Sequence, residues 1–198
     1  MNTIKKGNTF ENKVFEYIQK ELSNDRLHVL GRRSQAYQKR GYYSRDRQSE
    51  IITDISIETF LPDASDYSLL TIIECKDYNS TISVDDIEEF HSKVQQIAGD
   101  NVKAIFVTSA ALQRGALNYA KSKGIGIIRY LPDNQVKMIL SFMTLSIISK
   151  EEKLSQSEFN SAFLYPLHES NGRSFYACDK EYIYPSLFSI LNEYLNEK

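Results

Sequence analysis

The spacing of hydrophobic residues changes several times along the chain and predicts a succession of helices and strands. Apolar residues recur every four positions over about 9–22, which predicts a first helix. Apolar and polar residues alternate over 51–60, and 68–76 is mostly apolar, so two neighbouring strands are expected there. Two shorter strands, 27–30 and 35–38, are expected between the helix and this pair.

The pattern in the middle of the chain predicts two further helices and two further strands. Residues 83–98 have an apolar stripe at helical spacing. A second helix is expected over 112–123, with Gly124 at its end. The segments 103–108 and 125–131 are short and mainly apolar, as buried strands are. This order is typical of an α/β domain in which helices cover both faces of one mixed sheet.

Residues 132–198 predict an extension to this α/β core. The expected elements are a strand or buried helix at 138–148, a hairpin formed by 163–167 and 173–178, and a terminal helix at 185–197. The expected organisation is therefore a core domain over 1–131 and a C-terminal extension over 132–198. The extension would pack on the core or serve assembly. The tyrosines that suit an assembly surface are Tyr165, Tyr176, Tyr182, Tyr184 and Tyr194.

Composition excludes several classes of protein. The chain has 198 residues, of which 41% are hydrophobic and 25% charged, as in globular proteins. The longest apolar run, 138–148, is well short of the roughly 20 residues that a membrane-spanning helix needs. The first residues lack the apolar core of a signal peptide, and Cys75 and Cys178 form no cluster with histidine. We therefore expect a cytoplasmic protein with no membrane segment, disulfide framework or cysteine-rich zinc site.

Charge is distributed unevenly along the chain. Residues 26–50 contain seven basic and two acidic side chains, a balance of +5, whereas 151–198 contain four basic and eight acidic ones, a balance of −4. A basic segment in a protein of net charge −2 is a candidate contact for a polyanion, with a solvated hairpin as the alternative. The side chains expected to bind nucleic acid are Arg32, Arg33, Lys39, Arg40, Tyr43, Arg45 and Arg47.

Charged residues interrupt the two central strands. Glu74 and Lys76 are two positions apart, so they lie on the same face of their strand, after apolar residues on that face. If the two strands form a hairpin, Asp54 lies beside Glu74. Neighbouring carboxylates repel one another unless a proton or a cation lies between them, and Mg²⁺ prefers oxygen ligands. A lysine beside such a metal would stabilise the charge that develops on a phosphate.

Together these residues resemble the PD-(D/E)XK restriction-endonuclease-like nucleases, and among them the Mrr-like type IV restriction endonucleases and the Holliday-junction resolvase-like domains. The resemblance runs over about 7–130. It rests on Gly7, Phe10 and Glu11 in the first helix, on Asp54, on Glu74-Cys75-Lys76, and on the strand–helix–strand section from Val107 to Ile128. The family's proline before the aspartate is Thr53 here. The resemblance implies a restriction-endonuclease-like αβββαβ core, with helices flanking a mixed central sheet.

The resemblance also implies the chemistry of the site. Catalysis would fall to Asp54, Glu74, Lys76 and Glu11. The metal would be held by Asp54, Glu74, Glu11 and the backbone carbonyl of Cys75. It would be Mg²⁺, with Mn²⁺ as a substitute. The activity would be that of a metal-dependent endodeoxyribonuclease in defence or in DNA repair and recombination, and the partners would be DNA, a second copy of the chain or another protein of the same system.

Other interpretations of the same residues remain open. Glu11 would be a solvated acid in the first turn of its helix. Glu74 and Lys76 would form an ion pair at a sheet edge, and Asp54 would pair with Arg47 or Lys76. A chain that kept the fold without catalysis would be a DNA-binding or protein-interaction module. The polar side chains of the next helix that would reach the site, or simply face solvent, are Lys93, Gln95 and Gln96.

Overall fold

The computed structural model describes residues 3–24, 32–98, 101–131, 136–137, 156–171, 175–178 and 183–184. The helices are α1 (Thr3–Ser23), α2 (Val84–Ile97), α3 (Arg114–Ser122) and α4 (Gln156–Leu164). The strands are β1 (Ser34–Gln38), β2 (Gly41–Ser44), β3 (Ser49–Ile52), β4 (Ile55–Phe60), β5 (Tyr67–Lys76), β6 (Val102–Thr108), β7 (Gly126–Tyr130), β8 (Val136–Lys137), β9 (Ser170–Asn171), β10 (Phe175–Cys178) and β11 (Ile183–Tyr184).

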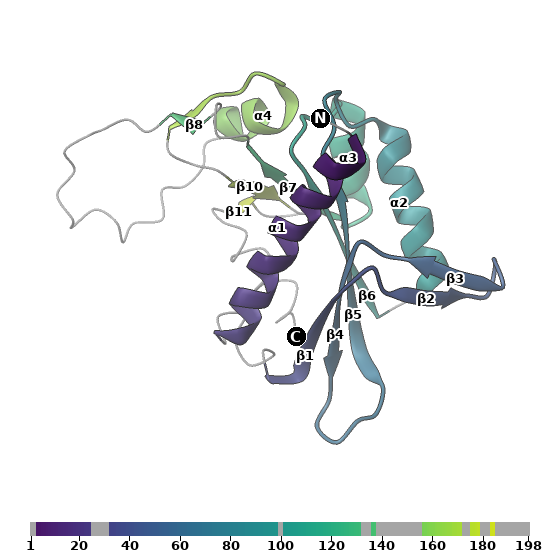
Figure 1. The fold of residues 1–198 in the computed structure, drawn as a ribbon. Helices are drawn as coiled ribbons and strands as arrows, with labels where there is room; N and C mark the ends of the chain where they lie inside the picture. Colours follow the sequence, from purple (N-terminus) through teal and green to yellow (C-terminus); the bar gives the residue numbers. More distant parts are fainter. Residues whose placement is uncertain are drawn as a thin grey trace.

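A mixed sheet of seven strands forms the centre of the molecule, in the order β1-β4-β5-β6-β7-β10-β11 (Figure 1). The neighbours β1, β4 and β5 are antiparallel, whereas β5, β6 and β7 run parallel. In chain order, α1, β1, β4, β5, α2 and β6 form the expected αβββαβ core, so the predicted fold class is confirmed. β10 of the extension pairs antiparallel with β7 and continues the sheet.

Two hydrophobic clusters hold the helices on opposite faces of this sheet. One cluster contains Ile55, Ile73 and Val107 of the sheet. It also contains the apolar residues that recur every four positions along α1, which are Phe10, Val14, Ile18 and Leu22. Residues of α2, α3 and α4 lie in the other cluster, which includes Ile72. Successive residues of β5 thus face different helices, as the alternation predicted. Glu74 has the parity of Ile72 and faces α2, whose Lys93 binds it.

Local sequence signals explain where α2 begins and where α3 ends. The Ser83 hydroxyl accepts a hydrogen bond from the N–H of Asp86, and the Asp86 carboxylate accepts one from the N–H of Ser83. This reciprocal capping satisfies backbone groups that a helix start leaves without partners. After α3, Gly124 has φ of +68°, a left-handed conformation that glycine adopts without steric cost.

The strand expected over 51–60 is present but is interrupted at residues 53–54. The chain leaves β3 at Ile52 and enters β4 at Ile55, and the two strands belong to different sheets. β3 pairs with β2 in the same register as β4 with β1, because Gln38 lies opposite Ile55 and Gly41 lies opposite Ile52. The N–H of Thr53 donates to the carbonyl of Arg40 at 2.9 Å and continues this pairing across the interruption.

The hairpin expected from 163–167 and 173–178 is wrong. Phe159, Ala162 and Phe163 are buried at helical spacing, and this segment forms α4. β10 pairs with β7 and β11 instead of with residues 163–167. Tyr176, suggested as part of an assembly surface, is fully buried. Sequence patterns alone do not reveal such long-range pairing.

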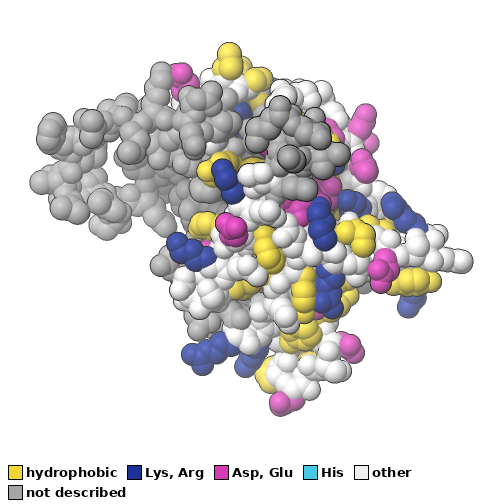
Figure 2. Space-filling view, viewed as in Figure 1, with side chains coloured by type: hydrophobic (Ala, Val, Ile, Leu, Met, Phe, Trp, Pro, Cys, Tyr) yellow, Lys and Arg dark blue, Asp and Glu magenta, His cyan; other side chains and the backbone are white. Residues whose placement is uncertain are grey.

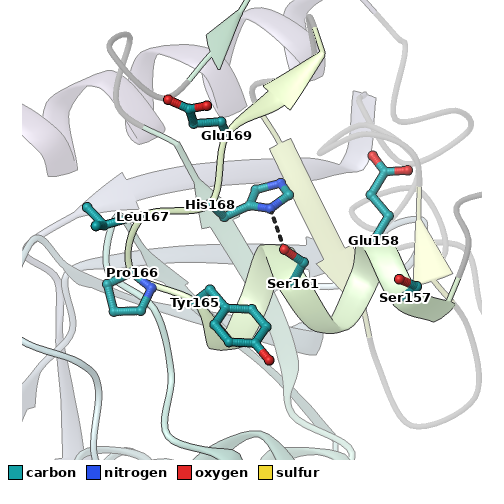
Figure 3. A pocket seen from close by; sticks show the side chains of 8 residues that line it. All are labelled: Ser157, Glu158, Ser161, Tyr165, Pro166, Leu167, His168 and Glu169. Carbon is teal, nitrogen blue, oxygen red and sulfur yellow. Dashed lines mark hydrogen bonds between the residues drawn. The ribbon is translucent and has the colours of Figure 1, made fainter.

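The segment after α4 folds back over this helix. Side chains from Ser157 to Glu169 line an open pocket there, and Ser161 and His168 point toward one another across it (Figure 3).

Three further expected elements, at 27–30, 138–148 and 185–197, lie outside the described residues. None of the described helices is long and apolar enough to cross a membrane. We retain the division at residue 131 as a proposal.

Candidate active site at the end of the central strand

The register of β4 and β5 brings Asp54 to the end of β5. Ile55 lies opposite Ile73, so Asp54, one residue earlier, lies beside the last residues of β5. Its carboxylate oxygen Oδ2 accepts a hydrogen bond from the N–H of Cys75 at 2.9 Å. The structure therefore brings Asp54 together with the Glu74–Lys76 segment, as a hairpin of these strands predicts.

Asp54 and Glu11 share one lysine. The ammonium nitrogen Nζ of Lys39 lies 2.6 Å from Oδ1 of Asp54 and 2.5 Å from Oε2 of Glu11. Glu11 is only 4% exposed, so it is not the solvated first-turn acid of the alternative interpretation. Asp54 pairs with neither base suggested by the sequence. Burial opposes the charge on Lys39, but hydrogen bonds to Asp54 and Glu11 outweigh it and raise the pKa of Lys39.

Glu74 lies between two other lysines. Its Oε2 is 2.8 Å from Nζ of Lys93 on α2, and its Oε1 is 3.5 Å from Nζ of Lys76. Glu74 is 5% exposed, so these ammonium groups compensate a buried charge. Burial again opposes the charge on Lys76, but Glu74 and then Tyr78 outweigh it and raise the pKa of Lys76. The predicted Glu74–Lys76 ion pair exists, but it lies on the central strand β5 and not at a sheet edge, and Lys93 is closer to Glu74 than Lys76 is.

Cys75 lies between these two groups. Burial raises the pKa of its thiol, and the nearby charges of Asp54, Glu11 and Glu74 raise it further. Three carboxylates thus surround the end of β5, divided between separate lysines. Among the described residues, no group of three or more His, Cys, Asp and Glu side chains is arranged to hold a metal ion.

The chemistry of this donor set nevertheless fits a hard divalent cation. Carboxylate and carbonyl oxygens are the ligands that Mg²⁺ and Mn²⁺ prefer. Glu11 and Glu74 are buried, and a buried carboxylate keeps its charge only beside a cation. Lysine ammonium groups supply that positive charge in this structure. The residues therefore fit the metal expected from the sequence.

The β2–β3 hairpin begins at this site. The N–H of Lys39 donates to the carbonyl of Asp54 at 2.9 Å, two residues before β2 and β3 begin to pair at Gly41 and Ile52. Tyr43 is 62% exposed on its outer face, and Arg45 and Arg47 are exposed at its turn. Lys and Arg side chains gather on and beside this region (Figure 2). Arg32 and Arg33 are also exposed, before β1.

Arg40 binds a buried carboxylate, although its own side chain is 41% exposed. Its Nε lies 2.9 Å from Oε1 of Glu58, which is 2% exposed. Its guanidinium lies 3.9 Å from the ring centroid of Tyr37, and the Tyr42 hydroxyl donates to the same Glu58 oxygen at 2.9 Å. Of the side chains predicted to bind nucleic acid, Lys39 and Arg40 are thus bound to carboxylates.

Sequence reasoning missed one contact of the site and left a second open. Gln38 donates from Nε2 to Oε1 of Glu11 at 2.8 Å, which depends on how β1 packs against α1. Lys93 was expected either to reach the site or to face solvent, and the structure shows that it reaches Glu74. It follows the buried Phe90 by three positions and precedes Val94, so its place at the border of the apolar stripe was the available signal.

Comparison with known proteins identifies a family. The family model described as Restriction endonuclease (Mrr_cat) matches residues 8–130. No curated protein matches the sequence significantly. Two solved structures are similar: a protein of unknown function (15% identity, 55% of each chain, TM-score 0.39) and a repair endonuclease from Pyrococcus abyssi (17% identity, 59% of this chain and 46% of that chain, TM-score 0.38). The chain therefore spans about half the length of these solved structures.

Proposed function

The chain belongs to the restriction endonuclease family, and we propose that it is a metal-dependent endonuclease that hydrolyses phosphodiester bonds in DNA. The observation that carries this proposal is that three carboxylates meet at the end of β5: Asp54 accepts a hydrogen bond from the N–H of Cys75, Lys39 joins Asp54 to Glu11, and Glu74 precedes Cys75 on the strand. Lys76 follows Glu74 on β5, and its Nζ lies 3.5 Å from Oε1 of Glu74. Paired carboxylates with an adjacent lysine are suited to metal-assisted phosphoryl chemistry.

The proposed metal ligands are Asp54, Glu74, Glu11 and the backbone carbonyl of Cys75. A bound divalent cation would supply Lewis-acid chemistry there, activating water and offsetting charge on the phosphate. The chain itself fixes the carboxylates. The N–H of Cys75 orients Asp54, and Lys93 orients Glu74 at 2.8 Å. Such supporting hydrogen bonds keep ligands in productive orientations.

Lys76 is the proposed catalytic lysine. Its side chain is 23% exposed, so its ammonium group is available at the surface of the site. Its raised pKa keeps it protonated at neutral pH, which lets it stabilise negative charge on a phosphate oxygen. We assign Lys93 the separate task of orienting Glu74.

DNA is proposed to lie against the hairpin that begins at the site. Arg45, Arg47 and the exposed ring of Tyr43 support this, because arginines neutralise phosphates and tyrosine stacks on bases.

We also propose a homodimer, in which two sites would act on the two strands of a duplex. Light scattering on the purified protein measures its molar mass in solution and so distinguishes a dimer from a monomer.

Cleavage of supercoiled plasmid tests the proposal. With Mg²⁺ or Mn²⁺ we expect nicked or linear DNA, and none with EDTA. Glu74→Gln, Asp54→Asn and Lys76→Met should each slow cleavage at least about 100-fold, because each removes a group that supports charge in the reaction. Glu88→Gln, which changes an exposed acid on α2, is the matched control and should keep the wild-type rate. Thermal unfolding establishes that every variant is folded.

The outcomes separate the alternatives. Full activity in a site variant would contradict the role given to that residue. A folded protein that binds DNA but cleaves none with either metal would favour the DNA-binding module. A parallel panel of unmodified plasmid, methylated plasmid and four-way junctions addresses the setting: preference for methylated DNA supports defence, and preference for junctions supports repair or recombination.

A further inference from the structure

We propose that Lys39 is a resident counter-ion of the metal site, whose ammonium group bridges Glu11 and Asp54 until a divalent cation displaces it. Lys39 thereby sets the affinity of the site for its metal. This inference rests on the proposed function, because Glu11 and Asp54 are two of the proposed ligands. It gives Lys39 a positioning role in place of the DNA contact suggested by its basic segment.

The contacts of the two carboxylates carry the inference. Nζ of Lys39 lies 2.5 Å from Oε2 of Glu11 and 2.6 Å from Oδ1 of Asp54. Their other oxygens accept hydrogen bonds, Oε1 of Glu11 from Gln38 and Oδ2 of Asp54 from the N–H of Cys75. Every oxygen of this pair thus has a donor, and a metal that binds Oε2 or Oδ1 competes with the ammonium group of Lys39.

The backbone also directs Lys39 to this position. Its φ is +53°, in the left-handed region that residues other than glycine seldom adopt. The N–H of Lys39 donates to the carbonyl of Asp54 at 2.9 Å, so the turn joins the same two residues as the side-chain contact. Such conformations persist where their surroundings determine them strongly, often at functional sites. The Lys39 side chain is 50% exposed, so its ammonium group can reach solvent when displaced.

Electrostatics gives this arrangement two consequences of opposite sign. An ammonium group and a divalent cation repel one another at contact distance, so they do not share the same pair of oxygens. Removal of the ammonium group leaves Glu11 and Asp54 facing one another without a positive charge. The metal-free protein then loses stability because like charges repel, whereas the attraction of the pair for a metal increases.

The experiment measures metal binding without substrate. Mn²⁺ is titrated by calorimetry into the wild type, Lys39→Met and Lys39→Arg. Lys13→Met, which removes an exposed lysine of α1, is the control. We expect Lys39→Met to bind Mn²⁺ at least about tenfold more tightly. Lys39→Arg, which keeps the charge, and Lys13→Met should bind as the wild type does. In EDTA, Lys39→Met should unfold at a lower temperature than the wild type and Lys13→Met.

A second readout excludes a purely structural role. If Lys39 stabilises only through its pairing with Glu11 and Asp54, then Lys39→Met should cost less stability in EDTA when Glu11→Gln is already present. Equal losses in both backgrounds would overturn the counter-ion assignment. So would unchanged or weaker Mn²⁺ binding by Lys39→Met.

The failures of the two proposals are distinguishable. If the wild type binds Mn²⁺ and cleaves DNA while Lys39→Met binds the metal no more tightly, only the role of Lys39 fails. If neither protein binds Mn²⁺ and neither cleaves DNA, the metal-dependent function fails and the counter-ion role fails with it. If Lys39→Met loses DNA affinity in EDTA with its Mn²⁺ affinity unchanged, Lys39 is a phosphate contact and the inference is overturned.

Discussion

His168 joins three polar side chains where α4 meets β10. Its Nδ1 lies 2.9 Å from the Ser161 hydroxyl and its Nε2 lies 3.1 Å from the Tyr176 hydroxyl, which in turn donates to Glu158. Burial and then the charge of Arg129 lower the pKa of His168, and Glu158 only partly opposes them. The folded protein therefore favours the neutral ring, whereas the unfolded chain takes up a proton near the ordinary pKa of about 6.5.

This difference predicts a dependence of stability on pH. Because the pKa of His168 is lower in the folded state, its contribution is complete above about pH 6.5 and is lost as pH falls toward the folded value. Melting temperatures between about pH 7.5 and 5.5 should therefore fall more steeply for the wild type than for His168→Gln. His91, whose pKa is also lowered, is present in both proteins and cancels in the comparison. Parallel curves would contradict the prediction.

At the residue scale, the sequence indicated which carboxylates gather and that Lys76 pairs with Glu74, but not that Lys39 joins Asp54 to Glu11. Asp54 and Glu74 were placed from strand alternation, which depends only on local spacing. The partners Lys39 and Lys93 depend on a left-handed turn and on the rotation of α2 over the sheet. Neither is encoded in a short stretch of sequence, so the pairing needed the folded chain.

At the scale of elements, the β2–β3 hairpin continues the β1–β4 pairing in the same register, although its strands belong to a second sheet. Ile51 and Ile55 have the same parity and both are buried, so 51–60 has the pattern of one strand. Tyr42 and Ile51 pack the inner face of the hairpin, while Tyr43 and Ile52 face outward. The hairpin rests on α2, where Nε of Arg47 donates to Oε1 of Gln96 at 2.7 Å. Its outer face carries the exposed side chains of Tyr43 and Ile52 and is the surface that we propose for DNA.

The hairpin arginines should contribute to DNA binding through charge. We expect Arg45→Gln with Arg47→Gln to weaken binding and to reduce the slope of log affinity against log salt by about two, because about one counter-ion is released per phosphate contact. Fluorescence anisotropy of a labelled duplex at several salt concentrations, in EDTA, measures both quantities. Arg114→Gln, an exposed arginine on α3, is the control. An unchanged slope would remove the hairpin from the interface.

At the scale of the whole molecule, the core was predictable and the extension was not. Helices and strands up to residue 131 follow clear periods, and the αβββαβ order follows from them. The extension depends on contacts between distant residues. β10 pairs with β7 across 45 positions, as Phe175 lies opposite Tyr130, and α4 approaches the sheet through Arg129.

Arg129 holds α4 to the sheet through backbone carbonyls of the described chain. Its side chain is 1% exposed, and burial lowers its pKa to about 10. Nη1 of Arg129 donates to the carbonyls of Ala162 and Tyr165, and Nη2 donates to the carbonyl of Pro166 at 3.3 Å. Carbonyl groups at a helix end carry partial negative charge, which suits a cation. The core and the extension therefore share one buried charge.

This shared charge predicts that residues 132–198 stabilise the core and that Arg129 is needed only in their presence. A chain ending at residue 131 uncovers the edge of β7, so its melting temperature should fall by more than about 5 °C. In the full chain, Arg129→Met should lower the free energy of unfolding by about 2–4 kcal/mol, because it leaves the carbonyls of α4 without donors. In the shortened chain Arg129 is solvated, and the same substitution should be nearly neutral. Urea unfolding of the four proteins measures this coupling, and equal effects of Arg129→Met in both lengths would show that Arg129 acts within the core alone.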